Sequence, residues 1–384
     1  MDIYFVYVLF SLLLMLLYVV IIWNYMRGWK QLCPWQVPQN FTTTTSVSII
    51  IPARNEADNI LLCLHSILKQ SYPQDLLQII VIDDHSTDAT PQLVTRLNDS
   101  RILLLKLVNF PSPTQNQSFK KQAINLGIQH ATGELIITTD ADCITPPDWL
   151  NLIVSFYEEK NPVFIAAPVN FYAEENALEK FQSLDFMGMM AITGAGIHQG
   201  WMHMCNGANL AYPKTAFYAV DGFVGIDHLA SGDDMLLMQK IARQFPNRIG
   251  FIKNKAATVL TKAKPTLRSF LQQRIRWASK STAYPEWKVT LVLALVFFFC
   301  CNILLALFLA LSWKVELFWL VIVQLLVKAI TDFVFLKKMA TFFDRRDLMH
   351  SFASAFFLHT AYIIGVGILG NIIKKYKWKG RKVS

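Results

Sequence analysis

The segment Leu135-Ile136-Ile137-Thr138-Thr139-Asp140-Ala141-Asp142 joins an apolar run to a pair of carboxylates. A short apolar run that stops at polar residues is typical of a buried β-strand reaching the surface. Residues i and i+2 of an extended chain point to the same side, so Asp140 and Asp142 can converge on one cation. Hard divalent ions are typically held by one or two carboxylates together with substrate phosphates. A plain strand-to-loop transition would give the same pattern, so the surrounding sequence must decide.

Three more apolar runs precede this segment, at residues 47–51, 79–82 and 102–108. Patterns typical of amphipathic helices fit between the runs, at 60–68 and around 123–130. Strands that alternate with helices predict βαβ units and a largely parallel sheet. Ligands of open α/β sheets bind beyond the carboxyl ends of the strands.

Acidic clusters occur at two of these predicted strand ends, Asp83-Asp84 and Asp140-Ala141-Asp142. Two such clusters favour a nucleotide site over chance. The strands carry neither a P-loop nor a Gly-x-Gly-x-x-Gly motif, which argues against an ATPase and against a dinucleotide oxidoreductase. A diphosphate would therefore be neutralised by other means, and a metal ion at Asp142 is one of them.

A basic stretch provides a second means. Residues 251–285 contain eight Lys or Arg and no Asp or Glu. Within it, Gln273-Arg274-Ile275-Arg276-Trp277 places Arg276 beside an indole, and Arg suits bidentate phosphate contacts and stacking on aromatic faces. Most of the lysines fit a membrane-surface helix, whereas Arg276 and Trp277 are assigned to the site.

Asp233 and Asp234 follow Gly232 at the start of a helical pattern at 235–242. Acidic residues at a helix N-terminus serve as caps. One of the two could equally act as a general base that takes a proton from an attacking sugar or lipid hydroxyl. Both interpretations stay open at this point.

Three runs without Asp, Glu, Lys or Arg, at 3–23, 289–313 and 351–373, are long enough to cross a bilayer as helices. A fourth, at 317–336, contains Lys328 and Asp332, which lie four residues apart and can pair inside the protein. The first run lacks a cleavage site and reads as an uncleaved anchor. Basic residues follow it and none precedes it, so the chain after the anchor should be cytoplasmic.

The net charge of +9 is concentrated at the C-terminus, where residues 374–384 hold six basic side chains and no acidic one. Such a tail marks the cytoplasmic side of a membrane. Three crossings after a cytoplasmic domain would leave it outside, so either one C-terminal segment is interfacial or re-entrant, or the anchor is oriented otherwise. The residues 342–350 look interfacial, and we give the tail more weight than the count of crossings. The six cysteines show no zinc spacing or disulfide framework, which suits a reducing compartment.

Taken in their order along the chain, these motifs resemble those of a membrane-bound, bacterial-type member of glycosyltransferase family 2. The resemblance covers about residues 47–284 together with the flanking membrane helices. It rests on the opening loop at 52–56, the base motif at 83–88, Lys121 with Asn125, the Asp-x-Asp at 140–142, Asp233-Asp234, and Gln273…Arg276-Trp277. The family pattern usually has Glu where Asp233 stands, so the side chain at this position is one methylene shorter than usual.

The resemblance implies a GT-A nucleotide-sugar-binding fold, which is a Rossmann-like α/β fold with a mostly parallel sheet, and an inverting enzyme. The implied catalytic residues are Asp234 as general base, Asp233, and Arg276, which stabilises the leaving diphosphate. The implied metal ligand is Asp142, for Mg²⁺ or Mn²⁺. The implied donor-binding residues are Pro52, Glu56, Asp83, Asp84, Lys121, Asp140, Gln273 and Trp277.

We expect a nucleoside-diphosphate sugar as donor, with UDP favoured, a lipid or lipid-linked hydroxyl as acceptor, and no nucleic-acid partner. A processive polysaccharide synthase and a polyprenyl-phosphate glycosyltransferase are the alternatives, and an inactive membrane scaffold is the non-enzyme alternative. The expected location is the cell (inner) membrane, with a cytoplasmic catalytic domain. The expected parts are an N-terminal transmembrane anchor at 1–25, a linker at 26–45, a GT-A domain at 46–286, C-terminal transmembrane or interfacial helices at 287–373, and a basic tail at 374–384.

Overall fold

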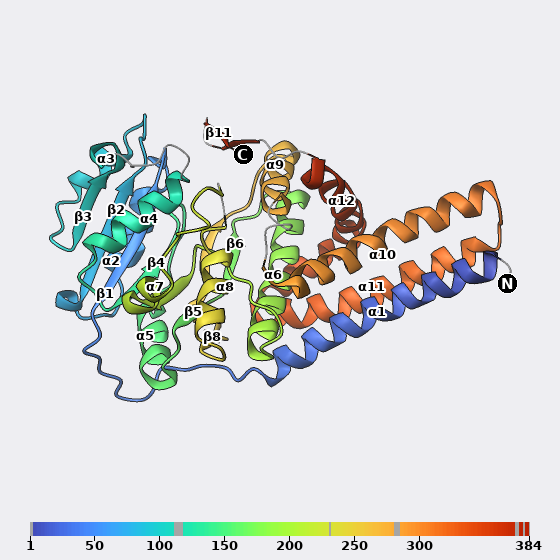
Figure 1. Cartoon of the computed structure of the whole chain (residues 1–384), viewed down its shortest axis with the longest axis horizontal. Helices are drawn as coiled ribbons and strands as arrows, with labels where there is room; N and C mark the ends of the chain where they lie inside the picture. Colours follow the sequence, from blue (N-terminus) through green and yellow to red (C-terminus); the bar gives the residue numbers. More distant parts are fainter. Residues whose placement is uncertain are drawn as a thin grey trace. The chain divides into compact units, whose positions relative to one another are not determined.

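The computed structural model describes residues 3–110, 118–229, 232–279, 285–372, 376–378 and 381–383. Figure 1 shows its helices and strands, coloured by their position along the sequence. The chain divides into two compact units. The helical unit comprises Met1–Gln31, Ala173–Ala195 and Ala263–Lys374, and the sheet unit comprises Leu32–Tyr172, Gly196–Lys262 and Lys375–Ser384. Two segments of the domain expected at 46–286 thus group with the apolar helices.

The sheet unit is built on seven strands in the order β3-β2-β1-β4-β7-β5-β8 (Figure 1). The pairs β1–β2, β1–β4 and β2–β3 are parallel, whereas β7 runs antiparallel to both β4 and β5. The predicted α/β fold with a mostly parallel sheet is confirmed. The strands are β1 (Val47–Ala53), β2 (Leu77–Asp83), β3 (Ile102–Lys106), β4 (Leu135–Thr138), β5 (Phe164–Ala166), β7 (Leu210–Pro213) and β8 (Ile249–Phe251).

Helices cover this sheet, and they bury the central strands. Every residue of β1 except Pro52 is buried, as expected for a parallel strand covered on both faces. Gly127 of α4 allows a close approach, because a Cβ there would lie 2.8 Å from Ile50 and 2.9 Å from Ile82. The helices of this unit are α2 (Ile60–Leu68), α3 (Thr90–Arg96), α4 (Phe119–His130), α5 (Trp149–Lys160), α7 (Lys214–Ala219) and α8 (Met235–Gln244).

Smaller elements complete the sheet unit. The strands β6 (Val169–Tyr172) and β9 (Val259–Lys262) pair in parallel, and β10 (Tyr376–Trp378) pairs antiparallel with β11 (Arg381–Val383). This hairpin lies in the basic tail, of which residues 374–375, 379–380 and 384 fall outside the described residues. Three 3₁₀ turns are also present, η1 (Gln74–Leu76), η2 (Leu107–Asn109) and η3 (Lys255–Ala257).

Among the described residues of the helical unit, four helices are long and apolar enough to cross a membrane, at Ile3–Gln31, Trp287–Ser312, Leu317–Phe342 and Arg346–Gly370. Lys328 and Asp332 lie 2.6 Å apart, Nζ to Oδ2, which confirms the predicted ion pair. The unit consists of α1 (Ile3–Gln31), α6 (Ala177–His198), α9 (Leu267–Ala278), α10 (Trp287–Ser312), α11 (Leu317–Phe342), η5 (Arg346–Ser351) and α12 (Phe352–Ile372).

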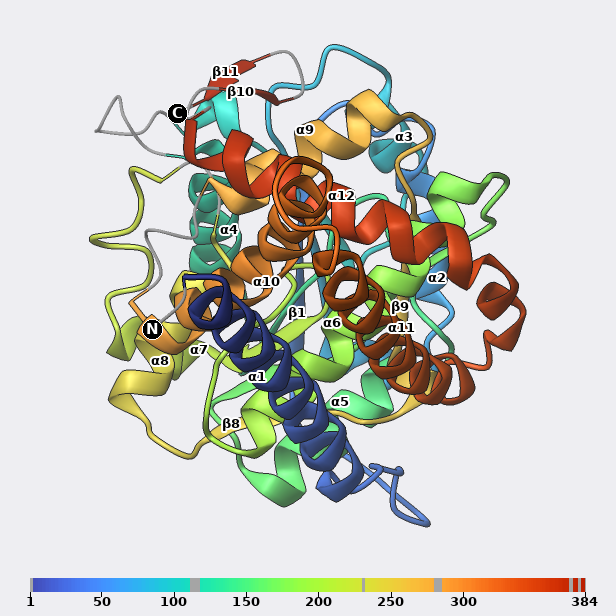
Figure 2. The same ribbon diagram turned by 90° about the vertical axis from the view of Figure 1, so that its right-hand side faces the viewer.

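The last of these helices differs from the others in direction. Figure 1 shows α1, α10 and α11 lengthwise and side by side, with α12 nearly end-on, and Figure 2 shows α12 lengthwise. Therefore α12 lies across the three long helices. Glycines allow it to pack tightly, because a Cβ at Gly367 would lie 2.4 Å from the Phe297 ring of α10 and one at Gly370 would lie 2.7 Å from Ala278 Cβ of α9.

Candidate functional site

The loops that follow β1 and β2 are joined by hydrogen bonds between their polar residues. The Asn55 amide donates to Ser86 Oγ at 3.0 Å, and the Thr87 amide donates to Asn55 Oδ1 at 2.8 Å. The Glu56 amide donates to Thr90 Oγ1 at 2.8 Å. These bonds fix the shape of both loops at the carboxyl end of the sheet, where ligands bind in this class of fold. The predicted donor-binding residues here are Pro52, Glu56, Asp83 and Asp84.

Three of those residues are carboxylates with little exposure. Glu56, Asp83 and Asp84 are 8%, 5% and 3% exposed. Arg54 Nη1 donates to the backbone oxygens of Asp84 and His85, at 2.7 and 2.9 Å, which holds the turn after β2. His85 takes a left-handed conformation (φ 55°), and its Nδ1 lies 3.0 Å from Asp84 Oδ1. The turn after β2 is thus held by contacts within the protein itself.

The Asp-x-Asp segment does not continue the strand. β4 ends at Thr138, and the Cys143 amide donates to the Asp140 oxygen at 3.1 Å, which closes a turn. The expectation that Asp140 and Asp142 share one side of an extended chain is therefore wrong, because the turn replaces the strand geometry. Both carboxylates nevertheless lie at the carboxyl end of β4 and are partly exposed.

Lys120 is the cation at the centre of the site. Its Nζ lies 3.0 Å from Asp140 Oδ1 and 3.2 Å from Asp233 Oδ2. Burial alone would lower the pKa of Lys120, but Asp140, Asp233 and Asp234 raise it above its ordinary value. The ammonium is therefore charged at physiological pH and links the end of β4 to the start of α8.

Asp234 caps helix α8 and also faces this cluster. Its Oδ1 accepts from the Met235 amide at 2.7 Å, and its Oδ2 accepts from the Gly207 amide at 2.9 Å. Burial and the neighbouring Asp233 raise the pKa of Asp234 to about 6, while Lys120 acts in the opposite direction. A carboxyl with a pKa close to neutral is suited to general base catalysis. The capping and the functional interpretations of this residue are thus compatible.

Gly207 occupies the space among these charged groups. A Cβ there would lie 3.5 Å from Asp233 Oδ2, from Asp234 Oδ2 and from Lys120 Nζ. Thr138 Oγ1 donates to the Gly207 oxygen at 3.2 Å, which ties the loop before β7 to the end of β4. The glycine therefore keeps the space beside the carboxylates open.

The structure separates the two neighbouring lysines. Lys121, predicted to bind the donor, is 1% exposed and donates to the backbone oxygens of Ile226 and Leu229, at 2.5 and 2.8 Å. Lys120, which the sequence analysis missed, reaches the carboxylates instead. The available signal was the lysine pair itself, because consecutive residues of a helix point in different directions and only one of them can face the strand ends.

Asn209, which lies just before β7, is a core residue in this structure. It is fully buried, and its Nδ2 donates to the backbone oxygens of Pro168 and Ala257 at 2.7 and 2.8 Å. Its Oδ1 accepts from Trp149 Nε1 at 2.9 Å. These three bonds occupy the side chain in holding the core together.

Gln273, Arg276 and Trp277 lie on α9 in the helical unit and are partly exposed. The helix begins with a capping box between Thr266 and Ser269. The buried Oε1 of Gln273 has no hydrogen-bond partner among the described residues.

The donor set fits a divalent ion that arrives with phosphates. Within the described part of the chain, no three His, Cys, Asp or Glu side chains form a preformed metal cluster. Mg²⁺ usually binds through one or two carboxylates plus substrate phosphates, and the partly exposed Asp142 at the end of β4 fits that description. The carboxylates of Asp140, Asp233 and Asp234 also outnumber the Lys120 ammonium, which favours an added cation.

Two family models match overlapping parts of this chain. The model of glycosyl transferase family 2 matches residues 48–220, and that of glycosyl transferase family group 2 matches residues 135–363. The second match covers 229 of the 384 residues (363 − 135 + 1), which is more than half of the chain. The chain belongs to glycosyltransferase family 2. Membership is consistent with strand-end acidic clusters in a sheet of this topology.

Two relatives illustrate the range of the family. The chain is 29% identical over 150 residues to Glycosyltransferase AglE of Haloferax volcanii, covering 38% of this chain and 48% of the relative. It is 30% identical over 112 residues to a Methanococcus voltae enzyme, covering 29% of this chain and 34% of the relative. That enzyme is named dolichyl N-acetyl-α-D-glucosaminyl phosphate 3-β-D-2,3-diacetamido-2,3-dideoxy-β-D-glucuronosyltransferase. The chain spans less than half the length of these relatives.

A solved structure shares the fold over most of the chain. The mannosyltransferase PcManGT from Pyrobaculum calidifontis, in complex with GDP-Man and Mn²⁺, superposes with a TM-score of 0.60. The match covers 91% of this chain and 96% of that one at 20% identity. The GT-A-type fold expected from the sequence is thereby confirmed.

Proposed function

We propose that this protein transfers a sugar, with inversion, from a nucleoside-diphosphate sugar to a hydroxyl of a lipid or lipid-linked acceptor. The observation that carries the proposal is the cluster of Asp140, Lys120, Asp233 and Asp234 at the carboxyl end of the sheet. It combines groups that can hold a diphosphate with a carboxyl whose pKa is raised to about 6. Sugar transfer to a hydroxyl needs both.

The loops after β1 and β2 would bind the nucleoside. Glu56, Asp83 and Asp84 offer carboxylate oxygens to the base and ribose, and the bonds between the two loops hold these residues in place. Preorganised groups of this kind cost little reorganisation when the ligand binds. Asp140 and Lys120 then lie beside the ribose and the diphosphate.

The proton of the acceptor hydroxyl passes to Asp234. Its carboxylate is anchored by the Met235 and Gly207 amides, so the oxygen lone pairs have a fixed direction. As the acceptor oxygen attacks the anomeric carbon, the bond to the diphosphate breaks on the opposite face. Lys120 stabilises the charge that develops on the leaving group, and the family resemblance implies the same role for Arg276. Inversion follows from this single displacement.

Asp142 and Asp140 would hold the divalent ion. When bound, Mg²⁺ or Mn²⁺ supplies positive charge that stabilises the diphosphate leaving group. PcManGT was solved with GDP-Man and Mn²⁺, which supports Mn²⁺ as a candidate metal and a GDP-sugar as an alternative to the UDP-sugar expected from the sequence.

The membrane arrangement supports a lipid-associated acceptor at the cytoplasmic face. The helices α1, α10 and α11 are three candidate crossings, and α12 lies across them as an interfacial helix would (Figure 2). If α1, α10 and α11 cross the membrane and α12 does not, an outside N-terminus would leave both the sheet unit and the basic tail in the cytoplasm, in line with the basic residues after α1 and at the C-terminus. The Methanococcus voltae relative, named for a dolichyl-phosphate-linked sugar acceptor, supports the same acceptor class.

Two alternative activities predict different chemistry. A processive synthase needs a pore, and three crossings per chain are few for one. A polyprenyl phosphate is already ionised and needs no general base, so the raised pKa of Asp234 favours a hydroxyl acceptor.

The test measures nucleoside diphosphate released from GDP-mannose and from UDP-sugars by the purified protein with Mn²⁺. Wild type is compared with Asp142→Ala and Asp234→Asn, and each protein is also assayed with a lipid extract as acceptor source. We expect both variants to lose most of the lipid-stimulated release. Equal turnover by all three proteins would refute the proposed function.

A further inference from the structure

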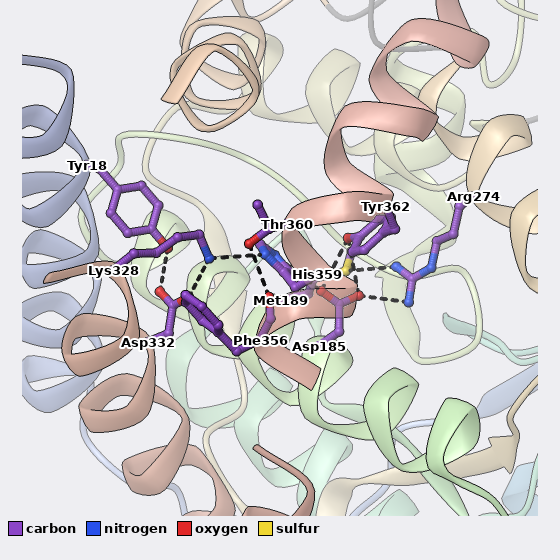
Figure 3. Close-up of polar contacts among 10 residues, drawn as sticks. All are labelled: Tyr18, Asp185, Met189, Arg274, Lys328, Asp332, Phe356, His359, Thr360 and Tyr362. Carbon is purple, nitrogen blue, oxygen red and sulfur yellow. Dashed lines mark hydrogen bonds and ion pairs between the residues drawn. The ribbon is translucent and has the colours of Figure 1, made fainter. Parts of the chain in front are cut away.

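Arg274 of α9 is a buried cation that no step of the proposed reaction uses. Its side chain is 4% exposed, and its Nη2 lies 2.8 Å from Oδ2 of Asp185 on α6, which is 6% exposed. Tyr362 of α12 donates its hydroxyl to Asp185 Oδ1 at 3.3 Å. Figure 3 shows Arg274 and Tyr362 pointing toward the same carboxylate. The ion pair thus joins α9 to α6, and the hydrogen bond from Tyr362 joins α12 to the same carboxylate.

Aromatic rings enclose the Arg274 guanidinium. Its central carbon lies 4.7 Å from the ring centroid of Trp277, 5.2 Å from that of Phe270 and 5.7 Å from that of Tyr362. A guanidinium over an aromatic face is held by a directional electrostatic attraction, which strengthens away from water. Trp277 is therefore fixed on one side by Arg274, and Phe186 of α6 lies 6.2 Å away from it, ring centroid to ring centroid.

Stability alone does not account for this arrangement. The free energy needed to move two charges out of water offsets much of their attraction for each other. Apolar residues of similar volume often stabilise a fold equally well. Burial raises the pKa of Asp185 in spite of the guanidinium, which reflects that cost. What the pair adds is a specific contact, which joins α9 to α6 and, through Tyr362, to α12. The close approach of Gly370 to Ala278 holds the same end of the helix, next to Trp277.

We propose that Arg274 is a positioning residue for sugar transfer, which sets the orientation of Trp277 and of the α9 face that carries Gln273 and Arg276. Asp185 and Tyr362 hold Arg274 in turn. The inference rests on the proposed function, in which that face of α9 serves the donor and the leaving group. Arg274 itself acts through Trp277 and does not contact the substrate.

The first test replaces the pair by apolar residues in the full-length protein, with Asp185→Leu and Arg274→Met combined so that no unpaired charge is buried. The readout is release of nucleoside diphosphate from GDP-mannose or UDP-N-acetylglucosamine, whichever the wild type hydrolyses faster. We expect thermal stability and the KM for the donor to stay close to wild type. We expect kcat to fall about 10-fold to 100-fold, because small misplacements of catalytic groups have effects of that size.

A second ion pair of the same unit provides the matched control. Lys328 pairs with Asp332 within α11, and Tyr18 of α1 donates to that carboxylate (Figure 3). The combination Lys328→Met with Asp332→Leu also removes an ion pair, between the fully buried Lys328 and the partly exposed Asp332, from a helix position that does not touch Trp277. His359 lies between this pair and Asp185, with its Nδ1 3.5 Å from Lys328 Nζ and its Nε2 3.9 Å from Asp185 Oδ1. We expect it to retain wild-type kcat. A loss equal to that of the Arg274 pair, or no loss in the Arg274 pair, would overturn the inference.

Arg274→Lys covers the case in which the apolar pair fails to fold. Lysine keeps the charge near Asp185 but has no planar group to stack on Trp277. We expect a folded protein with reduced kcat and an unchanged KM. Wild-type kcat in this variant would contradict the positioning role.

A double-mutant cycle separates the inference from the proposed function. If Arg274 acts through Trp277, the apolar pair should cause little further loss in a Trp277→Leu background, because coupled residues are not additive. Full activity of Trp277→Leu alone would refute the proposed role of α9 and the inference with it. Impaired Trp277→Leu with strictly additive losses would refute the inference only.

Discussion

Lys120 and Lys121 show how neighbouring residues of one type acquire different tasks. Lys120 bridges Asp140 and Asp233, whereas Lys121 holds the backbone at Ile226 and Leu229. The chemistry of a lysine pair is visible in the sequence, but the direction of each side chain is set by how α4 packs on β1 and β2. Asp140, Asp142 and Asp234 could be proposed as site residues from the sequence because they lie at the end of a predicted strand or at the start of a predicted helix.

The two lysines give a matched pair of variants. Lys120→Met removes the ammonium from the carboxylate cluster, and we expect roughly a 100-fold to 1,000-fold loss of turnover. Lys121→Met leaves two backbone oxygens without this donor, and we expect it to lower the melting temperature instead. Steady-state kinetics and thermal unfolding of both proteins check this. Loss of turnover in Lys121→Met alone, without destabilisation, would reverse our assignment.

The raised pKa of Asp234 predicts a pH dependence of both activity and stability. As a base it must be ionised, so we expect turnover to rise with pH through about 6 and then level off. Because its folded pKa lies above the unfolded value, the native state binds more protons between about pH 4 and 6. The contribution of Asp234 to stability therefore falls as pH rises across that window.

A pH–rate profile of the wild type checks the first part, and Lys120→Met provides an internal comparison. Lys120 lowers the pKa of Asp234, so its removal should move the rising limb of residual activity to higher pH. Asp234→Asn should abolish the limb. A flat wild-type profile between pH 5 and 8 would argue against Asp234 as the base.

The strands and helices of the sheet unit were largely predictable where buried apolar residues recur at a regular spacing along the sequence. The helix at 60–68 and the strand starting at 135 have the expected limits, because apolar runs and flanking turn residues coincide there. The turn at 140–143 was not predictable, since it depends on one bond between Cys143 and Asp140. The antiparallel insertion of β7 beside β4 was also missed, because a four-residue run does not identify its partner.

Gly133 sets how closely β1 and the start of β4 approach. A Cβ there would lie 2.5 Å from the Ser48 nitrogen and 2.6 Å from the Val47 carbonyl carbon, and backbone atoms cannot yield easily. We expect Gly133→Ala to destabilise the protein by about 1–3 kcal/mol. Thermal unfolding measures the effect, with Gly365→Ala as control, because a Cβ at that glycine meets nothing within 4 Å. Equal melting temperatures for the two variants would contradict this packing.

The molecule as a whole combines a family 2 sheet unit with apolar helices, and the sequence predicted both parts. It did not predict that residues Ala173–Ala195 group with the helical unit, because a Met- and Phe-rich helix suits a soluble core equally well. Nor did hydropathy reveal that α12 lies across α1, α10 and α11, since direction depends on contacts such as Gly367 with Phe297.

The proposed topology is testable with a native cysteine. Of the six cysteines, all within the described residues, Cys33 is the one with an exposed side chain, and it directly follows α1. We expect a membrane-impermeant maleimide to label Cys33 in permeabilised cells but not in intact cells, with Cys33→Ser as control. Labelling in intact cells would place the sheet unit outside.

The proposed function depends most on donor binding at the Asp-x-Asp turn. Its most direct test is thermal unfolding of wild type and Asp142→Asn with GDP-, UDP- and dTDP-sugars, each with and without Mn²⁺, because a ligand of the native state raises apparent stability. We predict that at least one nucleotide sugar stabilises the wild type in a metal-dependent manner and that Asp142→Asn loses the shift. Absence of a shift with every sugar, or an identical shift in Asp142→Asn, would contradict the central claim.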